Sequence, residues 1–307
     1  MDRFVLELVN QRWTNPLMDW IMIGLTTVGI VALPVMGYGL WKRGQHERHR
    51  RIGLAILWAL AGSTLLTLLF YYLAMRPRPA LLWPDTVRLI LPTPPLPAFP
   101  SGHAAAAFAT ATVLILGLRR CGVSLLAVVG ALVISYSRIY LGHHYPSDLF
   151  AGAVFGTATG AAVYGLLLRD GTVIERVRWL LWPQIGFVIV MTQMAYLDIL
   201  PQTLLKWPYS DKVIHALFFG AVVFWLTMWW PERWVRVGRW ALPLAIVLPI
   251  FLAMLEEIVQ VYSPLRTGSL MDLSADLVGM VVFWWLSRRF LATGHSILAE
   301  NADSVKA

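Results

Sequence analysis

Stretches of about twenty apolar residues recur along this chain, and they leave few alternatives to a membrane protein. A helix needs about 20 apolar residues to cross the roughly 30 Å of bilayer hydrocarbon. We predict nine spans of this kind, near residues 18–41, 52–74, 101–118, 122–139, 147–168, 179–197, 213–230, 240–258 and 272–287. The composition agrees, since 58% of the 307 residues are hydrophobic and only 14% are charged. The fold expected is therefore an all-α, polytopic membrane protein.

Lysine and arginine are distributed unevenly over the loops between these spans. Sixteen of the 25 lie in alternate loops that would share one side of the membrane, and nine lie on the other. By the positive-inside rule the richer side is cytoplasmic, which predicts an N-terminus outside and a C-terminus inside. The net charge of +8 then reflects topology and gives no reason to expect a nucleic-acid partner. We expect the outer arginines Arg3, Arg12 and Arg88 to reach lipid headgroups.

The loop at 169–178 is the best candidate for a domain boundary, because the polar residues before it and after it differ in kind. We predict a first membrane module over residues 1–170, a second over 179–290 and a cytoplasmic tail over 291–307. The single cysteine, Cys121, excludes an internal disulfide and a thiolate metal cluster.

Three polar clusters of the first module emerge on the outer side in this topology: "RPRP" at 76–79, "PSGH" at 100–103 and "SRIYLGHHYPSD" at 137–148. Arginine suits a phosphate ester because its planar guanidinium group matches phosphate oxygens and keeps its charge. Ser101 is expected to cap a helix whose first amide groups would face an anion. The small residues around His103, among them Gly102, leave room for that anion.

Phosphate hydrolysis without a metal needs a nucleophile and an acid for the leaving group, and two histidines can supply both near neutral pH. We take His103 and His144 as this pair. Asp148 lies one helical turn after His144, where a carboxylate can fix the tautomer and orientation of the imidazole.

These three clusters resemble the three-part signature of the type 2 phosphatidic acid phosphatase superfamily of membrane lipid phosphatases, over about residues 1–170. The resemblance implies that His144 is the nucleophile that forms a phosphohistidine, with Asp148 as its partner and His103 as the general acid. It also implies that no metal or other cofactor takes part. The phosphoryl oxygens would be held by Arg78, Ser101, Gly102 and Arg138.

One position departs from the family pattern. The signature usually begins with a lysine seven residues before the arginine, and Tyr71 stands there in this chain. We expect Arg76 to replace the charge of that lysine and to bind the substrate phosphate.

The opening segment "VNQRWTNPLMDWIM" is similar to bacterial undecaprenyl diphosphate phosphatases of the same superfamily. This similarity makes undecaprenyl diphosphate the first candidate substrate, with phosphatidylglycerol phosphate and phosphatidic acid as alternatives. The resemblance also implies the bacterial inner membrane, with the active site facing the periplasm. A non-enzymatic protein that binds or transports anionic lipid is the competing class, and the oligomeric state stays open.

The second module collects another set of polar residues at predicted helix ends: Asp211, His215, Glu256, Gln260, Arg266, Asp272 and Asp276. Three pairs among them are spaced four residues apart, so each pair shares a helix face. The segments "DKVIH", "EEIVQ" and "RTGSLMDLSAD" are similar to VanZ-like membrane domains. Ionisable groups next to hydrocarbon suggest a second lipid site. The alternative is that these groups pair only to hold helix ends together.

Overall fold

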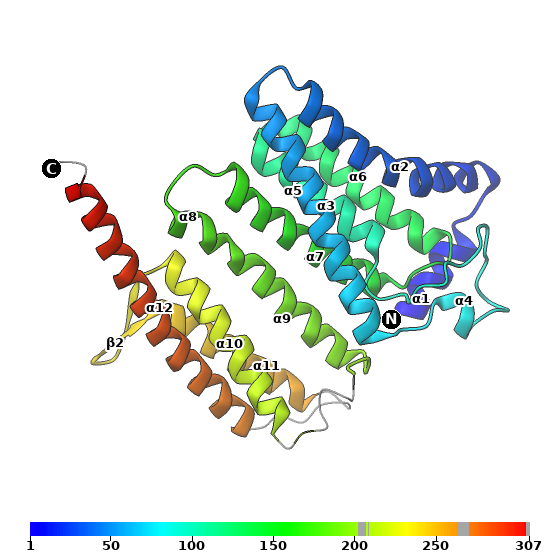
Figure 1. Ribbon diagram of the computed structural model, residues 1–307. Helices are drawn as coiled ribbons and strands as arrows, with labels where there is room; N and C mark the ends of the chain where they lie inside the picture. The colour runs from blue at the N-terminus through cyan, green and yellow to red at the C-terminus, as the bar shows by residue number, and fades with distance from the viewer. Residues whose placement is uncertain (202–206, 208, 263–269, 305–307) are drawn as a thin grey trace. The chain divides into compact units, whose positions relative to one another are not determined.

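The computed structural model describes residues 1–201, 207, 209–262 and 270–304 (Figure 1). The chain forms two compact units, one of residues 1–170 with 189–200 and the other of residues 171–188 with 201–307. Helix α9 is shared between them. The roles assigned to the two predicted modules stay predictions.

Every element of the first unit in the described residues is a helix. These are α1 (Asp2–Glu7), the π-helix η1 (Leu8–Arg12), α2 (Pro16–Arg43), α3 (Glu47–Ala74), α4 (Pro79–Leu82), α5 (Gly102–Leu118), α6 (Cys121–Tyr140), α7 (Pro146–Val163) and the π-helix η2 (Tyr164–Leu168).

The second unit combines helices with one short hairpin. Its elements are α8 (Val173–Val177), the 3₁₀ helix η3 (Arg178–Leu180), the first half of α9 (Leu181–Tyr196), α10 (Ser210–Trp229), β1 (Trp234–Val237), β2 (Trp240–Pro243), α11 (Leu244–Val261) and α12 (Leu270–Ser304).

Six helices in the described residues are long and apolar enough to cross a membrane, fewer than the nine expected. They cover the expected spans in α2, α3, α6, α7, α10 and α12. The other three expected spans coincide with α5, α9 and α11, and α5 is apolar but only 17 residues long. A multi-pass membrane protein is confirmed, whereas the number nine and the sidedness of the termini stay predictions.

The structure agrees with the all-α expectation apart from one short hairpin in the described residues. Trp234–Val237 and Trp240–Pro243 pair as an antiparallel hairpin, with Val237 opposite Trp240 and Trp234 opposite Pro243. Gly238 lies in the turn at φ +61°, a left-handed conformation that glycine adopts without strain. The span expected from residue 240 therefore begins as a helix only at Leu244.

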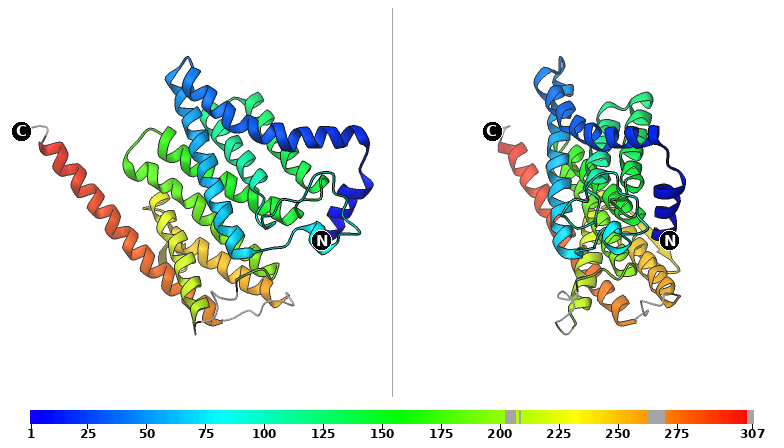
Figure 2. Two further views of the ribbon diagram at one scale, coloured as in Figure 1. Left: turned by 45° about the vertical axis from the view of Figure 1, so that its right-hand side comes forward. Right: turned by 90° about the vertical axis from the view of Figure 1, so that its right-hand side faces the viewer.

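Small residues bring α5 and α7 into close contact, and these two helices lie side by side with α3 in the views of Figures 1 and 2. A Cβ atom added to Gly152 would lie 2.9 Å from the Cβ of Ala104 and would overlap the carbonyl oxygen of Ser101. At Gly156 it would meet the backbone of Ala105 and Ala109. The alanines after His103 are thus needed for the close packing of α5 on α7. This is a second reason for small residues here, besides the space expected for an anion.

Candidate active site

The candidate site lies where three segments of the first unit meet: the end of α3 with the loop after it, the start of α5, and the turn from α6 to α7. Backbone hydrogen bonds tie these segments together, since the amide of Ser101 donates to the carbonyl of Asp148 at 2.9 Å. Tight packing of α5 on α7 keeps this bond in place. The three sequence clusters are therefore brought to one end of the helices.

Arg78 joins the loop before α5 to the turn before α7. Its Nε donates to the carbonyl of Leu96 at 2.7 Å, and one terminal nitrogen donates to the carbonyl of His143 at 2.9 Å. The same nitrogen lies 3.2 Å from Nε2 of His144. Although it is charged, Arg78 is only 3% exposed, so it is fixed next to the imidazole.

His144 is held in one tautomer by its two neighbours. Its Nδ1 lies 2.8 Å from the carbonyl oxygen of Ala98, which can only accept, so Nδ1 carries the proton. Its Nε2 faces Arg78, which can only donate, so Nε2 keeps its lone pair. Burial lowers the pKa of His144 well below its usual value, and the Arg138 and Arg78 guanidinium groups lower it further. The imidazole is therefore neutral with a nucleophilic Nε2.

Asp148 is completely buried at the first turn of α7. One carboxylate oxygen accepts from the amide of Tyr145 at 2.9 Å and lies 3.4 Å from Nδ1 of His144. The nearer partner of Nδ1 is thus the backbone carbonyl of Ala98, which the sequence did not reveal. Asp148 lies close to the imidazole, as expected, but Asp148 and the Ala98 carbonyl together orient the ring.

The structure places Arg76 differently from the expectation that it binds phosphate. One terminal nitrogen donates to Asp148 at 2.6 Å and to the hydroxyl of Ser147 at 2.8 Å. The other donates to Asp2 at 2.8 Å, and the guanidinium carbon lies 4.0 Å from the centroid of the Tyr145 ring. Because two carboxylates already neutralise it, Arg76 supports Asp148 and is not placed as a replacement for the lysine.

Ser101 and Arg138 provide buried polar atoms that have no partner among the described residues. Ser101 is the N-cap of α5, yet its hydroxyl makes no capping bond, and the side chain is fully buried. Arg138 is 3% exposed; one terminal nitrogen donates to the Thr26 hydroxyl from α2, while its Nε is unpaired. Buried donors without acceptors are costly unless a ligand satisfies them.

His103, Gly102 and Tyr71 complete the surroundings. His103, at the second position of α5, is partly exposed and interacts electrostatically with His144 and Arg138. The hydroxyl of Tyr71 would lie 3.6 Å from a Cβ on Gly102, and Tyr71 interacts electrostatically with Arg78. Tyr71 therefore lies next to two other residues of the signature, Gly102 and Arg78.

His143 has a separate role from His144. Its Nε2 lies 3.2 Å from the carbonyl of Leu91 and its side chain is 2% exposed, which ties the long loop after α4 to this turn. Burial, followed by the charge of Arg138, lowers the pKa of His143 to about 4.

The polar residues predicted in the second unit form pairs. His215 Nδ1 lies 3.1 Å from Asp276, and Lys212 is paired with Asp211 at 2.8 Å and also with Asp272. These contacts join α10 to α12. Glu256 accepts a hydrogen bond from Gln260 within α11, and Arg266 lies outside the described residues. These pairs agree with the alternative stated above, in which the polar groups hold helix ends together.

Comparison with known proteins identifies a family and individual relatives. The family model described as "PAP2 superfamily" matches residues 52–171. The chain is 30% identical over 149 residues to undecaprenyl-diphosphatase BcrC of Bacillus subtilis, covering 48% of this chain and 73% of that protein.

Two further proteins are similar to this chain, one over a shorter stretch of sequence and one as a solved structure. Lipid A 4'-phosphatase of Bacteroides thetaiotaomicron is 47% identical over 66 residues, 22% of this chain and 29% of that protein. The crystal structure of Aquifex aeolicus LpxE has 31% sequence identity and a TM-score of 0.43, covering 53% of this chain and 93% of that chain.

Proposed function

The chain belongs to the PAP2 superfamily, and its relatives support a membrane lipid phosphatase; from this premise we propose that it hydrolyses undecaprenyl diphosphate. The observation that carries the proposal is the neutral His144, whose Nε2 lone pair lies beside buried cationic donors. Phosphatidylglycerol phosphate, phosphatidic acid and the phosphate of lipid A are the alternatives, the last favoured by the similarity to lipid A 4'-phosphatase.

In the proposed reaction, Nε2 of His144 attacks the terminal phosphorus and forms a P–N bond while the bond to the leaving oxygen breaks. His103, protonated as the imidazolium ion, gives one proton to that oxygen and becomes neutral, and the lipid product leaves. A water molecule then attacks the phosphohistidine, with His103 as the base that accepts its proton. Inorganic phosphate leaves and His144 returns to its neutral state, so no metal is needed to balance either step.

The buried donors around His144 would hold the phosphoryl oxygens. Arg78, Arg138, the Ser101 hydroxyl and the Gly102 amide all lie at this end of the unit, and two of the four present atoms without partners in the described residues. Donors fixed in a buried site stabilise developing charge more strongly than donors in water. An anion in this place would satisfy the atoms that the protein leaves unpaired.

Tyr71 is proposed to take the position of the missing lysine. Its hydroxyl lies beside Gly102 and Arg78, where it can donate a hydrogen bond to a phosphoryl oxygen. A neutral donor supplies less binding energy than a lysine ammonium group. We infer that the permanent positive charge of the site comes from Arg78 and Arg138, in addition to the proton that His103 carries as the general acid.

An apolar groove supports a lipid substrate. It has a volume of about 260 Å³ and lies between α2, α5 and α6, where it is lined by residues such as Ala107, Gly130 and Ile134. Ala107 lies one helical turn after His103, and Ile134 lies one turn before Arg138. The groove thus begins next to the phosphate site and continues along the membrane-spanning helices, where the hydrocarbon chain of the substrate would lie.

Phosphate release from a panel of detergent-solubilised lipids tests the function. Wild-type protein is expected to release phosphate in EDTA, fastest from undecaprenyl diphosphate, and the His144→Ala variant to lose at least about a thousandfold in turnover. His46→Ala is the matched control, since His46 is an exposed residue in the connection between α2 and α3. Unchanged turnover in His144→Ala, or a loss in EDTA that a divalent metal restores, would contradict the mechanism.

The orientation in the membrane and the second unit remain part of the proposal. We place the site at the periplasmic face, as the distribution of Lys and Arg favours. We propose that the second unit is VanZ-like and that it presents lipid substrate. Because residues 189–200 pack with the first unit, a full-length Asp276→Asn variant is a better test than truncation. Equal turnover on every lipid would remove the presenting role.

A further inference from the structure

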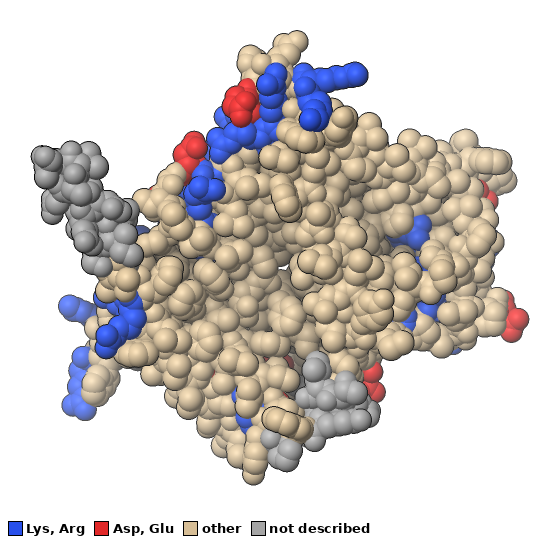
Figure 3. Space-filling view, viewed as in Figure 1, with Lys and Arg blue, Asp and Glu red and all other residues tan. Residues whose placement is uncertain are grey.

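A basic pocket lies at the opposite end of the first unit from the candidate active site. Helix α3 begins at Glu47 beside this pocket and ends near Tyr71; its 28 residues span about 40 Å. Helix α5 runs the other way, from Ser101 to Gly117. The space-filling view shows Lys and Arg gathered around the connection between α2 and α3, at this end (Figure 3).

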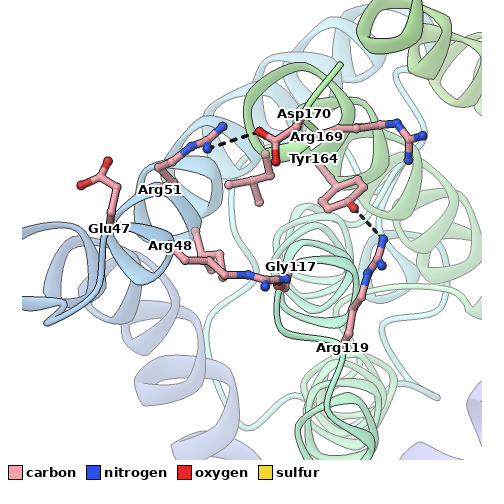
Figure 4. A pocket seen from close by; sticks show the side chains of 10 residues that line it. Glu47, Arg48, Arg51, Gly117, Arg119, Tyr164, Arg169 and Asp170 are labelled. Carbon is pink, nitrogen blue, oxygen red and sulfur yellow. Dashed lines mark hydrogen bonds and ion pairs between the residues drawn. The ribbon is translucent and has the colours of Figure 1, made fainter. Parts of the chain in front are cut away.

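The pocket has a volume of about 580 Å³, a size typical of small-ligand sites. Four arginines line it: Arg48 and Arg51 from the first turns of α3, Arg119 at the end of α5 and Arg169 at the end of η2. We call it the arginine pocket. Two carboxylates, of Glu47 and Asp170, also line it, so the side chains leave a net charge of about +2. Figure 4 shows these guanidinium groups together with the ring of Tyr164.

Helix capping accounts for two of the arginines. Arg48 donates Nε and a terminal nitrogen to the carbonyl of Gly117, at 3.1 and 2.8 Å, and Arg51 donates to the carbonyl of Leu167 at 2.6 Å. Both carbonyls lie in the last turn of a helix, where unpaired C=O groups favour cations. The ion pair of Arg51 with Asp170 is long, at 3.8 Å, and exposed, so it contributes little.

Capping does not account for Arg119 and Arg169. Arg119 donates one bond, to the hydroxyl of Tyr164 at 3.1 Å. The Nε of Arg169 is buried and has no partner among the described residues, although its backbone closes the π-helix η2. Each guanidinium group carries five N–H donors, so most donors of this pair are available to a ligand.

We propose that the arginine pocket binds a phosphate-bearing anion, either the headgroup of an anionic phospholipid in the adjoining leaflet or free inorganic phosphate. Guanidinium groups match phosphate oxygens in charge and in the spacing of their donors. Basic pockets between helices at a membrane surface bind anionic headgroups in the same way. The proposal does not depend on turnover at the other end of the unit.

The single cysteine allows a direct test. Cys121 is exposed and lies two residues after Arg119, so a fluorophore attached there reports on the arginine pocket and is remote from His144. One arm titrates labelled protein in detergent with inorganic phosphate. The other compares nanodiscs of phosphatidylcholine alone with nanodiscs that also contain phosphatidylglycerol, and counts retained lipids by native mass spectrometry.

The Arg119→Gln/Arg169→Gln double variant is expected to weaken the phosphate or phosphatidylglycerol response at least about tenfold. The charge-matched control is Arg43→Gln/Arg120→Gln, which removes two exposed arginines at the same end that do not line the pocket. A response to phosphate identifies free anion as a ligand, and a response only to phosphatidylglycerol identifies the headgroup. No saturable response from the wild type in either arm, or equal weakening in both variants, would overturn the proposal.

Discussion

Replacing Gly152 with alanine tests whether close contact between α5 and α7 holds the candidate active site together. The added Cβ would lie 2.9 Å from the Cβ of Ala104, whereas carbon atoms prefer separations of about 3.5–4.0 Å. The helices must therefore separate locally by about 1 Å. Ser101 and His103 move with α5, and Asp148 lies one turn before Gly152 on α7, so the shift opens the site itself.

Two magnitudes follow for Gly152→Ala. Overpacking destabilises a protein by about 1–3 kcal/mol, and the loss of a helical glycine offsets about 0.5–1 kcal/mol of this. A displacement of 1 Å among catalytic groups lowers the rate by about a hundredfold. We therefore expect a modest fall in the melting temperature and a fall in kcat/KM of about two orders of magnitude.

The assay is phosphate release measured alongside thermal unfolding in the same detergent. Gly39→Ala in α2 is the control, because a Cβ there meets nothing within 4 Å and both substitutions gain the same helix propensity. If Gly152→Ala keeps the turnover and melting temperature of the control, packing of α5 on α7 does not position the site.

Three further outcomes are expected. Gly130→Leu should raise KM for a long-chain lipid phosphate but not for a short-chain one, because the new side chain fills the apolar groove, where a Cβ meets nothing within 4 Å. The control is Gly122→Leu, which has equal space on the same helix but lies outside the groove. Equal KM values for the two variants would show that the groove does not bind the substrate. Tyr71→Phe should lower kcat/KM about ten- to hundredfold, the usual effect of losing one hydrogen bond to a charged group. Unchanged kinetics would show that the Tyr71 hydroxyl does not reach the phosphate. Because the pKa of His144 is lowered, its imidazole stays unprotonated as the pH falls. The acidic limb of the pH profile of kcat/KM should therefore lie below the ordinary histidine value of about 6.5. A limb at 6.5 or above would contradict the neutral state assigned to His144.

The three sequence clusters at 76–79, 100–103 and 137–148 were predicted to form the site, and the structure brings them together. Contacts between distant parts of the chain were missed because they leave no local pattern. The Ala98 carbonyl that accepts from His144 is a backbone atom, so no residue type signals it. Asp2, which pairs with Arg76, lies in the first helix, 74 positions away. The expectation that Arg76 replaces the charge of the lysine did not include this contact, because no local pattern reveals it.

The expectation for Arg88 was wrong for a related reason. An arginine beside a predicted span usually extends its side chain to headgroups, but Arg88 makes two bonds to the carboxylate of Asp19, at 2.9 and 3.0 Å. Asn10 accepts from the amide of Arg88 and donates to its carbonyl, so the long loop is fixed to the first helices. The hairpin at 234–243 was missed because the arginines of its first strand and turn indicate a loop, and its second strand runs directly into the apolar stretch of α11.

The phosphohistidine itself is the most direct test of the catalytic proposal. Wild-type protein mixed with undecaprenyl diphosphate is quenched within the first turnover and digested, and the peptides are analysed by mass spectrometry under alkaline conditions. We expect one phosphoryl group on the peptide of His144, localised to that residue and absent from His144→Ala. A phosphoryl group on another residue, or phosphate release by His144→Ala at the wild-type rate, would contradict the account.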